Sequence, residues 1–326
     1  MLVSEQKILI LNTGGTLSST LTKNGLAPGL GREDILRDLE WVSGNIHIDF
    51  EDIYSLDSAN IGPEDWKNIA VKVRENYEAY SGIVIIHGTD TMAYTASMLT
   101  WMLQNVPIPV VLTGSQLSIE HPVADALENC RLAIQMAASG YPGVFIAFNR
   151  KIMLGCKASK VRTMSFDAFE SINYPYICKV NSHGMKIEEN YIPKIHGKFT
   201  VNTEYSDKVM LLKLTPGLDP VVLYSLYEMG YEGVVIEAFG LGGMPFREKN
   251  WIKAVYELVE KGMAIVVGTQ CRYEGSDLRV YETGRESLAC GVMQAKEMTA
   301  EAAVTKLMWA LGQTKDRDMI DKILQA

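Results

Sequence analysis

The segment ILILNTGGTLSS, residues 8–19, contains the first residues whose types suggest chemistry. A buried-looking apolar run leads into Thr13-Gly14-Gly15-Thr16, two glycines between two hydroxyl groups. Glycine lets a small ligand approach the backbone closely. The turn lacks the further glycine and the lysine of the dinucleotide and phosphate loops, which disfavours a nucleotide site. Two interpretations stay open for this segment alone: a nucleophilic threonine hydroxyl, or a purely structural turn capped by Thr16.

A second polar cluster follows the apolar run in GIVIIHGTDTM, residues 82–92. His87 is interpreted as a hydrogen-bonded structural histidine, and either Asp90 or Thr91 would serve as a helix cap. A cap needs only one such residue, however, and several polar residues arrive together here. A carboxylate beside a hydroxyl can orient a cation and hold or activate water, so Thr89 and Asp90 are candidate site residues.

A base would have to accept the proton of any nucleophilic threonine, because the hydroxyl is weakly reactive at neutral pH. Lysine serves as that base only where burial or a neighbouring cation lowers its pKa. Residues 149–169, NRKIMLGCKASKVRTMSFDAF, supply Lys157 and Lys160 in what we interpret as a glycine-containing loop after a strand. Composition alone does not choose between the two lysines, and a solvated charged loop is the plain alternative.

These residues lie after strand-like runs that alternate with helical patterns. Helices are expected over 63–80 and 90–105, and Pro63 followed by two acidic residues suits a helix N-terminus. Runs this apolar on both faces are typical of a parallel sheet covered by helices, where ligands bind beyond the carboxyl ends of the strands. Strands are expected over 7–12, 82–88, 108–114, 143–149, 208–217, 232–240 and 263–270.

A change of composition divides the chain. Residues 181–208 are polar, contain glycine and show no sustained period, whereas strand and helix patterns resume after them. A length of 326 residues is also typical of two domains. We predict an α/β fold with a larger N-terminal domain over 1–190 that carries most of the site, a connection over 191–208, and a smaller α/β domain over 209–326.

Charge and cysteine content exclude several classes of protein. The formal net charge is −8 without a long basic run, which argues against a nucleic-acid surface and a membrane-surface helix. No apolar run reaches the length of a bilayer span, and the N-terminus lacks the pattern of a secretory signal. The five cysteines are scattered without a CxxC pair, so neither a disulfide framework nor a zinc site is predicted. We expect a cytoplasmic protein without a metal.

The segments TGGTLSS and GIVIIHGTDTMAYT resemble the two signature segments of the L-asparaginase family, specifically its cytoplasmic type I branch. The resemblance covers nearly the whole chain. It implies hydrolysis of the asparagine side-chain amide to aspartate and ammonia without a metal or organic cofactor. It also implies a flavodoxin-like larger domain, a smaller α/β domain, and a homodimer or homotetramer. Further segments that carry it are SLDSANIGPEDW (55–66), VVLTGSQ (110–116), KASKVRTMSFDAF (157–169), LTPGLDP (214–220) and GTQCRYEGSDLRVYETGRESLACGV (268–292).

The resemblance assigns expected roles residue by residue. Thr16 matches the nucleophilic threonine, and Lys160 rather than Lys157 matches the lysine of the second catalytic group. A free amino acid needs opposite charges in fixed places, and backbone donors would stabilise the oxyanion formed at its amide. The other matched positions are Thr89 and Asp90 in the second catalytic group, Asp57 and Ser58 in the substrate-binding turn, Ser115 at the amide carbonyl, Gly15 as a substrate contact, and Asp90 again for the α-ammonium.

Two positions depart from the family pattern. A lid is expected over 17–34, but Leu26 stands where a tyrosine would assist the nucleophile, so a partner subunit or another residue would have to supply that hydroxyl. Some relatives bind asparagine at a second site through the cysteine of a TQC segment, matched here by Cys271. Glu237 replaces the arginine expected nearby, so we predict no such site and expect Cys271 to be a small buried residue.

Two rival functions remain. The asparaginase-like subunit of an archaeal glutamyl-tRNA amidotransferase shares the threonine motifs, but it carries an extra N-terminal domain, and here the first motif lies near Met1. A non-catalytic amino-acid sensor is the second rival, which Leu26 alone favours and the retained Lys160 opposes. A nucleotide-binding dehydrogenase is less consistent still. Free hydrolysis of asparagine is the predicted function.

Overall fold

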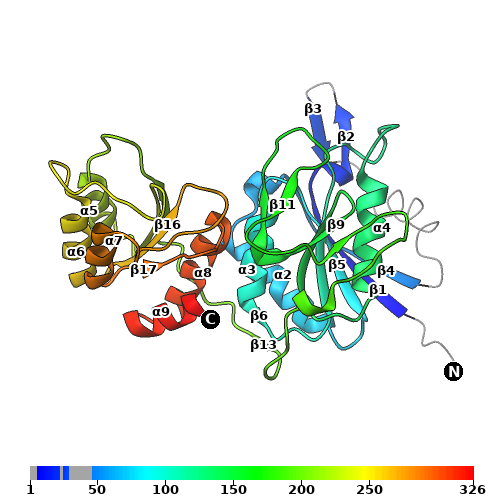
Figure 1. The fold of residues 1–326 in the computed structure, drawn as a ribbon. Coiled ribbons are helices and arrows are strands. Elements are labelled where there is room, and N and C mark those ends of the chain that lie inside the picture. The colour runs from blue at the N-terminus through cyan, green and yellow to red at the C-terminus, as the bar shows by residue number, and fades with distance from the viewer. Residues whose placement is uncertain (1–5, 23–24, 29–45) are drawn as a thin grey trace. The chain divides into compact units, whose positions relative to one another are not determined.

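The computed structural model describes residues 6–22, 25–28 and 46–326, and the chain divides into two compact units, Met1–Thr203 and Glu204–Ala326 (Figure 1). Each unit has its own sheet and its own hydrophobic core. The predicted α/β fold with a larger N-terminal part and a smaller C-terminal part is therefore confirmed. The exact domain boundaries stay a prediction.

The first unit is built on a seven-stranded sheet in the order β12-β9-β8-β7-β5-β1-β4. Its five central strands, β4, β1, β5, β7 and β8, are parallel. Numbered along the chain, these five strands follow the order 2-1-3-4-5, which is the flavodoxin-like order.

The strands and helices of the first unit are all short to moderate in length. The elements are β1 Gln6–Gly14, β2 Ser19–Thr22, β3 Gly25–Pro28, β4 Ile46–Leu56, β5 Gly82–Ile86, β6 Leu103–Gln104, β7 Pro109–Thr113, β8 Gly143–Phe148, β9 Lys151–Leu154, β10 Ala158–Lys160, β11 Phe169–Ser171, β12 Cys178–Lys179, β13 Thr200–Val201, α2 Pro63–Asn76, α3 Met92–Met102, α4 Ala126–Ala137, and the 3₁₀ turns η1 Thr16–Ser18, η2 Ser58–Asn60, η3 Gly155–Lys157 and η4 Glu189–Tyr191.

The central strands are apolar on both faces because helices cover both. Ile8 and Ile10 of β1 lie in the same buried cluster as residues of α4. The intervening Leu9 is 3% exposed and Leu11 is fully buried, so the second face is covered as well. Burial on both faces explains why these strands are continuous apolar runs in the sequence.

One edge of the sheet differs from the predicted parallel arrangement. Strands β8 and β9 form an antiparallel hairpin, and β12 pairs antiparallel to β9. The two residues that connect the hairpin, Asn149 and Arg150, both have positive φ angles, 45° and 60°. A two-residue loop with left-handed backbone at both positions is the turn that matches strand twist. Much of the stretch interpreted as a loop from residue 149 onward is therefore strand.

The second unit is a four-stranded parallel sheet in the order β14-β15-β16-β17. Trp251 is fully buried in its core and donates a hydrogen bond from Nε1 to the Leu218 carbonyl at 3.1 Å. Within the described part of the chain, no helix combines the length and apolarity needed to cross a bilayer. The elements of this unit are β14 Val209–Lys213, β15 Gly233–Ala238, β16 Ala264–Thr269, β17 Met293–Gln294, α5 Val221–Glu228, α6 Trp251–Glu260, α7 Glu282–Ala289, α8 Ala300–Gln313 and α9 Arg317–Gln325.

Candidate active site

Four loops meet at one edge of the first unit's sheet, beyond the carboxyl ends of β4, β1, β5 and β7. The strand order reverses at β1, and ligands of open α/β sheets bind at such a reversal. The loops bring together the residues that the sequence singled out. They carry Gly15 and Thr16 after β1, Asp57 and Ser58 after β4, Thr89 and Asp90 after β5, and Ser115 after β7.

The two glycines of the first loop allow two backbones to touch. Gly14 and Gly15 have φ angles of 107° and 87°, in the left-handed region that favours glycine. A Cβ atom on Gly15 would lie 2.5 Å from both N and Cα of Gly88. The glycine turn thus serves a close backbone contact, and it places the loop with Thr16 directly against the loop with Thr89.

Thr16 opens the 3₁₀ turn η1 and is partly buried. Its neighbours hold it on both sides: Gly15 donates its N–H to the Leu56 carbonyl at 3.0 Å, and Leu17 is fully buried in the core. The lid expected over 17–34 and the side chain of Leu26 lie largely outside the described residues.

The loop after β4 is tied to the loop after β5 through Ser58, which is 3% exposed. Its Oγ accepts a hydrogen bond from the Asp90 N–H at 3.3 Å, and its carbonyl accepts one from the Thr91 hydroxyl at 2.7 Å. Thr91 occupies the N-cap position of α3, but its side chain makes no capping bond. Asp57 is exposed and accepts the Ala59 N–H at 2.9 Å, which caps η2.

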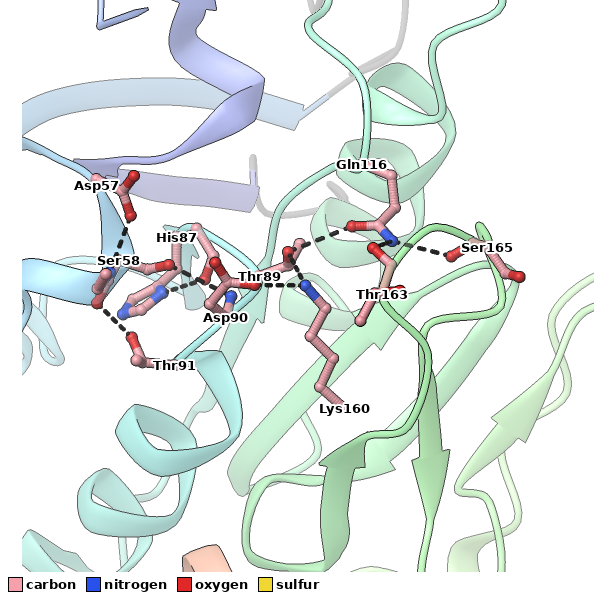
Figure 2. Close-up of polar contacts among 12 residues, drawn as sticks. Asp57, Ser58, His87, Thr89, Asp90, Thr91, Gln116, Lys160, Thr163 and Ser165 are labelled. Carbon is pink, nitrogen blue, oxygen red and sulfur yellow. Dashed lines mark hydrogen bonds and ion pairs between the residues drawn. The ribbon is translucent and has the colours of Figure 1, made fainter. Parts of the chain in front are cut away.

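Lys160 connects Thr89 and Asp90 (Figure 2). Its Nζ donates to Thr89 Oγ1 at 2.8 Å and to Asp90 Oδ1 at 2.6 Å. The Lys160 side chain is 16% exposed and the Asp90 side chain 67%, so the carboxylate remains open to solvent. The lysine ends strand β10, which pairs with β11, and is not in a loop. Lys157 instead lies 5.7 Å from the ring centroid of Tyr174.

Gln116 is a site residue that was not predicted from the sequence. Its Oε1 accepts a hydrogen bond from Thr89 Oγ1 at 3.3 Å, and its Nε2 donates to the carbonyls of Thr163 and Ser165 at 3.1 and 3.0 Å (Figure 2). The available signal was its place in TGSQ, just beyond the end of β7. Its neighbour Ser115 is 1% exposed.

His87 stabilises the loop after β5 from within the core. Its Nδ1 lies 2.7 Å from the Gly88 carbonyl, so Nδ1 carries the proton, and its Nε2 accepts the Thr95 hydroxyl at 2.9 Å. Thr95 in turn accepts the Trp66 Nε1–H at 2.9 Å. Burial lowers the pKa of His87 from 6.5 to about 4, so the ring is neutral near pH 7. These contacts confirm the structural interpretation of this histidine.

The buried neutral His87 predicts a specific loss of stability in acid. The unfolded chain gains a proton below pH 6.5, whereas the folded chain does so only near pH 4. The free energy of unfolding should therefore fall by about 3 kcal/mol from this residue as the pH drops from 7 to 4. Urea unfolding at several pH values, with His87→Asn as a non-titrating comparison, measures this. Equal pH dependence in both proteins would contradict the prediction.

In the second unit, the expectation for Cys271 is wrong, because the residue is exposed. It follows β16, where the Thr269 hydroxyl accepts the Cys271 N–H at 3.0 Å and turns the chain out of the sheet. Glu237 lies on β15, and its carbonyl accepts Gln270 Nε2 at 3.0 Å. That no effector site exists there stays a prediction.

Comparison with known proteins covers both units. The family models "Asparaginase, N-terminal" and "Glutaminase/Asparaginase C-terminal domain" match residues 7–193 and 208–324. An L-asparaginase of Thermococcus kodakarensis is 44% identical over 98% of this chain and 97% of the relative. An asparaginase-like subunit of the glutamyl-tRNA(Gln) amidotransferase from the same organism is 35% identical over 97% of this chain and 74% of the relative.

Solved structures give the same match. The thermostable L-asparaginase from Thermococcus kodakarensis superposes with a TM-score of 0.91 at 44% identity, over 98% of this chain and 97% of that chain. L-asparaginase I from Vibrio cholerae superposes with a TM-score of 0.88 at 28% identity, over 99% of this chain and 97% of that chain.

Proposed function

The chain belongs to the asparaginase family of amidohydrolases, and from this premise we propose that it hydrolyses the side-chain amide of L-asparagine to L-aspartate and ammonia. The observation that carries the proposal is the Lys160 ammonium, bonded to both Thr89 and Asp90 at the strand reversal where small ligands bind. The 44% identity to an L-asparaginase over nearly the full length supports asparagine as the substrate.

The substrate's two charged groups have complementary partners at this edge. The exposed side of the Asp90 carboxylate is free to pair with the α-ammonium, because Lys160 contacts one of its two oxygens, Oδ1. Ser58 and neighbouring backbone N–H groups are assigned to the α-carboxylate. Asp57 belongs to the same turn, and Gly15 allows the substrate to lie close to the backbone.

The proposed reaction proceeds through two acyl transfers. The Thr16 oxygen attacks the amide carbon, and the backbone N–H groups of Thr89 and Ser115 stabilise the oxyanion. Collapse of this intermediate breaks the C–N bond, and ammonia leaves with the proton that Thr16 gave up. Water then attacks the resulting ester, with Thr89 and Lys160 handling its proton, which releases aspartate and restores Thr16. No metal or organic cofactor is required by these steps.

The amidotransferase subunit remains the second candidate, since one such protein is 35% identical over 97% of this chain. That activity would release ammonia from glutamine for a partner protein. We propose the free hydrolase, acting as a homodimer or homotetramer in the cytoplasm without nucleic acid, because identity and matched length are both higher for the L-asparaginase.

Ammonia release by the purified chain, with L-asparagine and L-glutamine in parallel, tests the proposal. We expect kcat/KM for asparagine to exceed that for glutamine by about 10-fold or more, since one methylene in a fitted pocket changes kcat/KM by about 10- to 200-fold. Release from glutamine alone would favour the amidotransferase subunit. Asparagine binding by calorimetry without any release would favour a sensor.

A further inference from the structure

Gln116 bridges two parts of the site that are far apart in the sequence. Its amide lies between the Thr89 hydroxyl and the loop that follows Lys160, residues 161–168, which we call the hairpin loop (Figure 2). The orientation of the amide follows from its partners. Two carbonyls, those of Thr163 and Ser165, face Nε2 and require a donor there, so Oε1 must face Thr89.

The backbone of Gln116 is held as firmly as its side chain. Its N–H donates to both carboxylate oxygens of Asp125, at 3.0 and 3.1 Å. Asp125 is 8% exposed and also accepts the Asn129 side-chain amide at 2.9 Å. The amide therefore projects from a rigid base rather than from a freely moving loop.

These contacts decide which way the Thr89 hydroxyl points. Lys160, as an ammonium, donates and cannot accept, so Thr89 accepts from it. The single proton of the hydroxyl is then directed to Gln116 Oε1. Without that acceptor, the hydroxyl would be free to rotate, and the hairpin loop beside Lys160 would lose two of its hydrogen bonds.

We propose that Gln116 is a positioning residue of the amide hydrolysis: it orients the Thr89 hydroxyl so that a lone pair faces Lys160, and it holds the hairpin loop in place. The inference rests on the proposed function. Gln116 acts on the reaction through Thr89 and Lys160, so its loss should lower kcat more than it raises KM. A misplaced catalytic group costs up to about 10²-fold in rate.

Two substitutions separate this role from simple support of the loop. Gln116→Met keeps the length of the side chain but removes both hydrogen-bonding groups. Arg162→Met is the matched control, because Arg162 donates to the Asp167 carbonyl at 2.8 Å and pairs with Glu170 at 2.8 Å, which holds the same loop without touching Thr89.

We expect Gln116→Met to lower kcat for asparagine by about 10- to 100-fold with KM changed less than about 3-fold. Arg162→Met should lower the Tm by a similar amount with kcat retained. Gln116→Glu adds a pH-dependent readout: its protonated carboxyl mimics the amide, with one donor and one acceptor. Its kcat relative to wild type should rise as the pH falls.

Three outcomes overturn the inference. In the first, Gln116→Met matches wild type in kcat. In the second, both Met variants lose kcat equally, which would assign Gln116 to loop support alone. In the third, the unmodified chain releases no ammonia from asparagine, which removes the proposed function and this role with it. The wild-type assay therefore distinguishes failure of the function from failure of the positioning role.

Discussion

Replacing Thr16 by valine is expected to lower kcat for asparagine by about 10³-fold or more, because a valine of the same shape cannot form the acyl intermediate. The protein should remain folded. Valine preserves the branched shape of the partly buried threonine, and neighbouring Leu17 continues to anchor the turn in the core. Steady-state ammonia release and urea unfolding measure the two quantities.

Thr13 is a matched control for this experiment, since it is the other threonine that flanks the two glycines. Its hydroxyl donates to the Ile86 carbonyl at 2.8 Å in the core. Thr13→Val should therefore cost about 1–2 kcal/mol of stability and retain activity. If Thr16→Val kept most of its activity, the nucleophile would have to be another residue, with Thr89 the first to test.

Replacing Lys160 by methionine is expected to lower kcat by about 10²- to 10⁴-fold, the range for loss of a proton-transfer group. Stability should change by less than about 1 kcal/mol, because the Asp90 partner of the ion pair is largely exposed. Ammonia release across a range of pH, together with thermal unfolding, tests both statements.

Lys157→Met is the control for Lys160→Met, since the two lysines lie close together in the chain and differ in their surroundings. Lys157 packs over the Tyr174 ring and ends η3, away from Thr89. Its replacement should change kcat by less than about 2-fold, because it removes no contact of the reacting groups. Equal losses in the two variants would show that the charge of the segment, rather than the contact with Thr89, supports activity.

The sheet could be predicted largely because its central strands are buried on both faces. Such strands are written as continuous apolar runs, and their ends are marked by glycine and polar residues. The antiparallel edge could not be predicted in the same way. It depends on Asn149 and Arg150 both adopting left-handed backbone, and arginine carries no sequence preference that would announce this.

The site was predictable to the extent that its residues follow strand ends. Thr89 and Asp90 were found on that ground. Lys160 could not be chosen over Lys157 from the residues alone, because the choice depends on the pairing of β10 with β11. Gln116 was missed for a related reason: its amide becomes informative only when the hairpin loop folds back beside it. Contacts made between distant segments leave no local pattern.

The long sequence separations within the site have a consequence for how the chain folds. The Lys160–Thr89 hydrogen bond joins residues 71 positions apart, and the Ser58–Asp90 bond joins residues 32 apart. Contacts across such separations form late, because a long loop must close before any of them is made. A ribosome that has not yet synthesised β10 holds a chain with its threonines in place but no lysine to meet them. Catalytic competence is thus acquired only when the last segment of the site arrives.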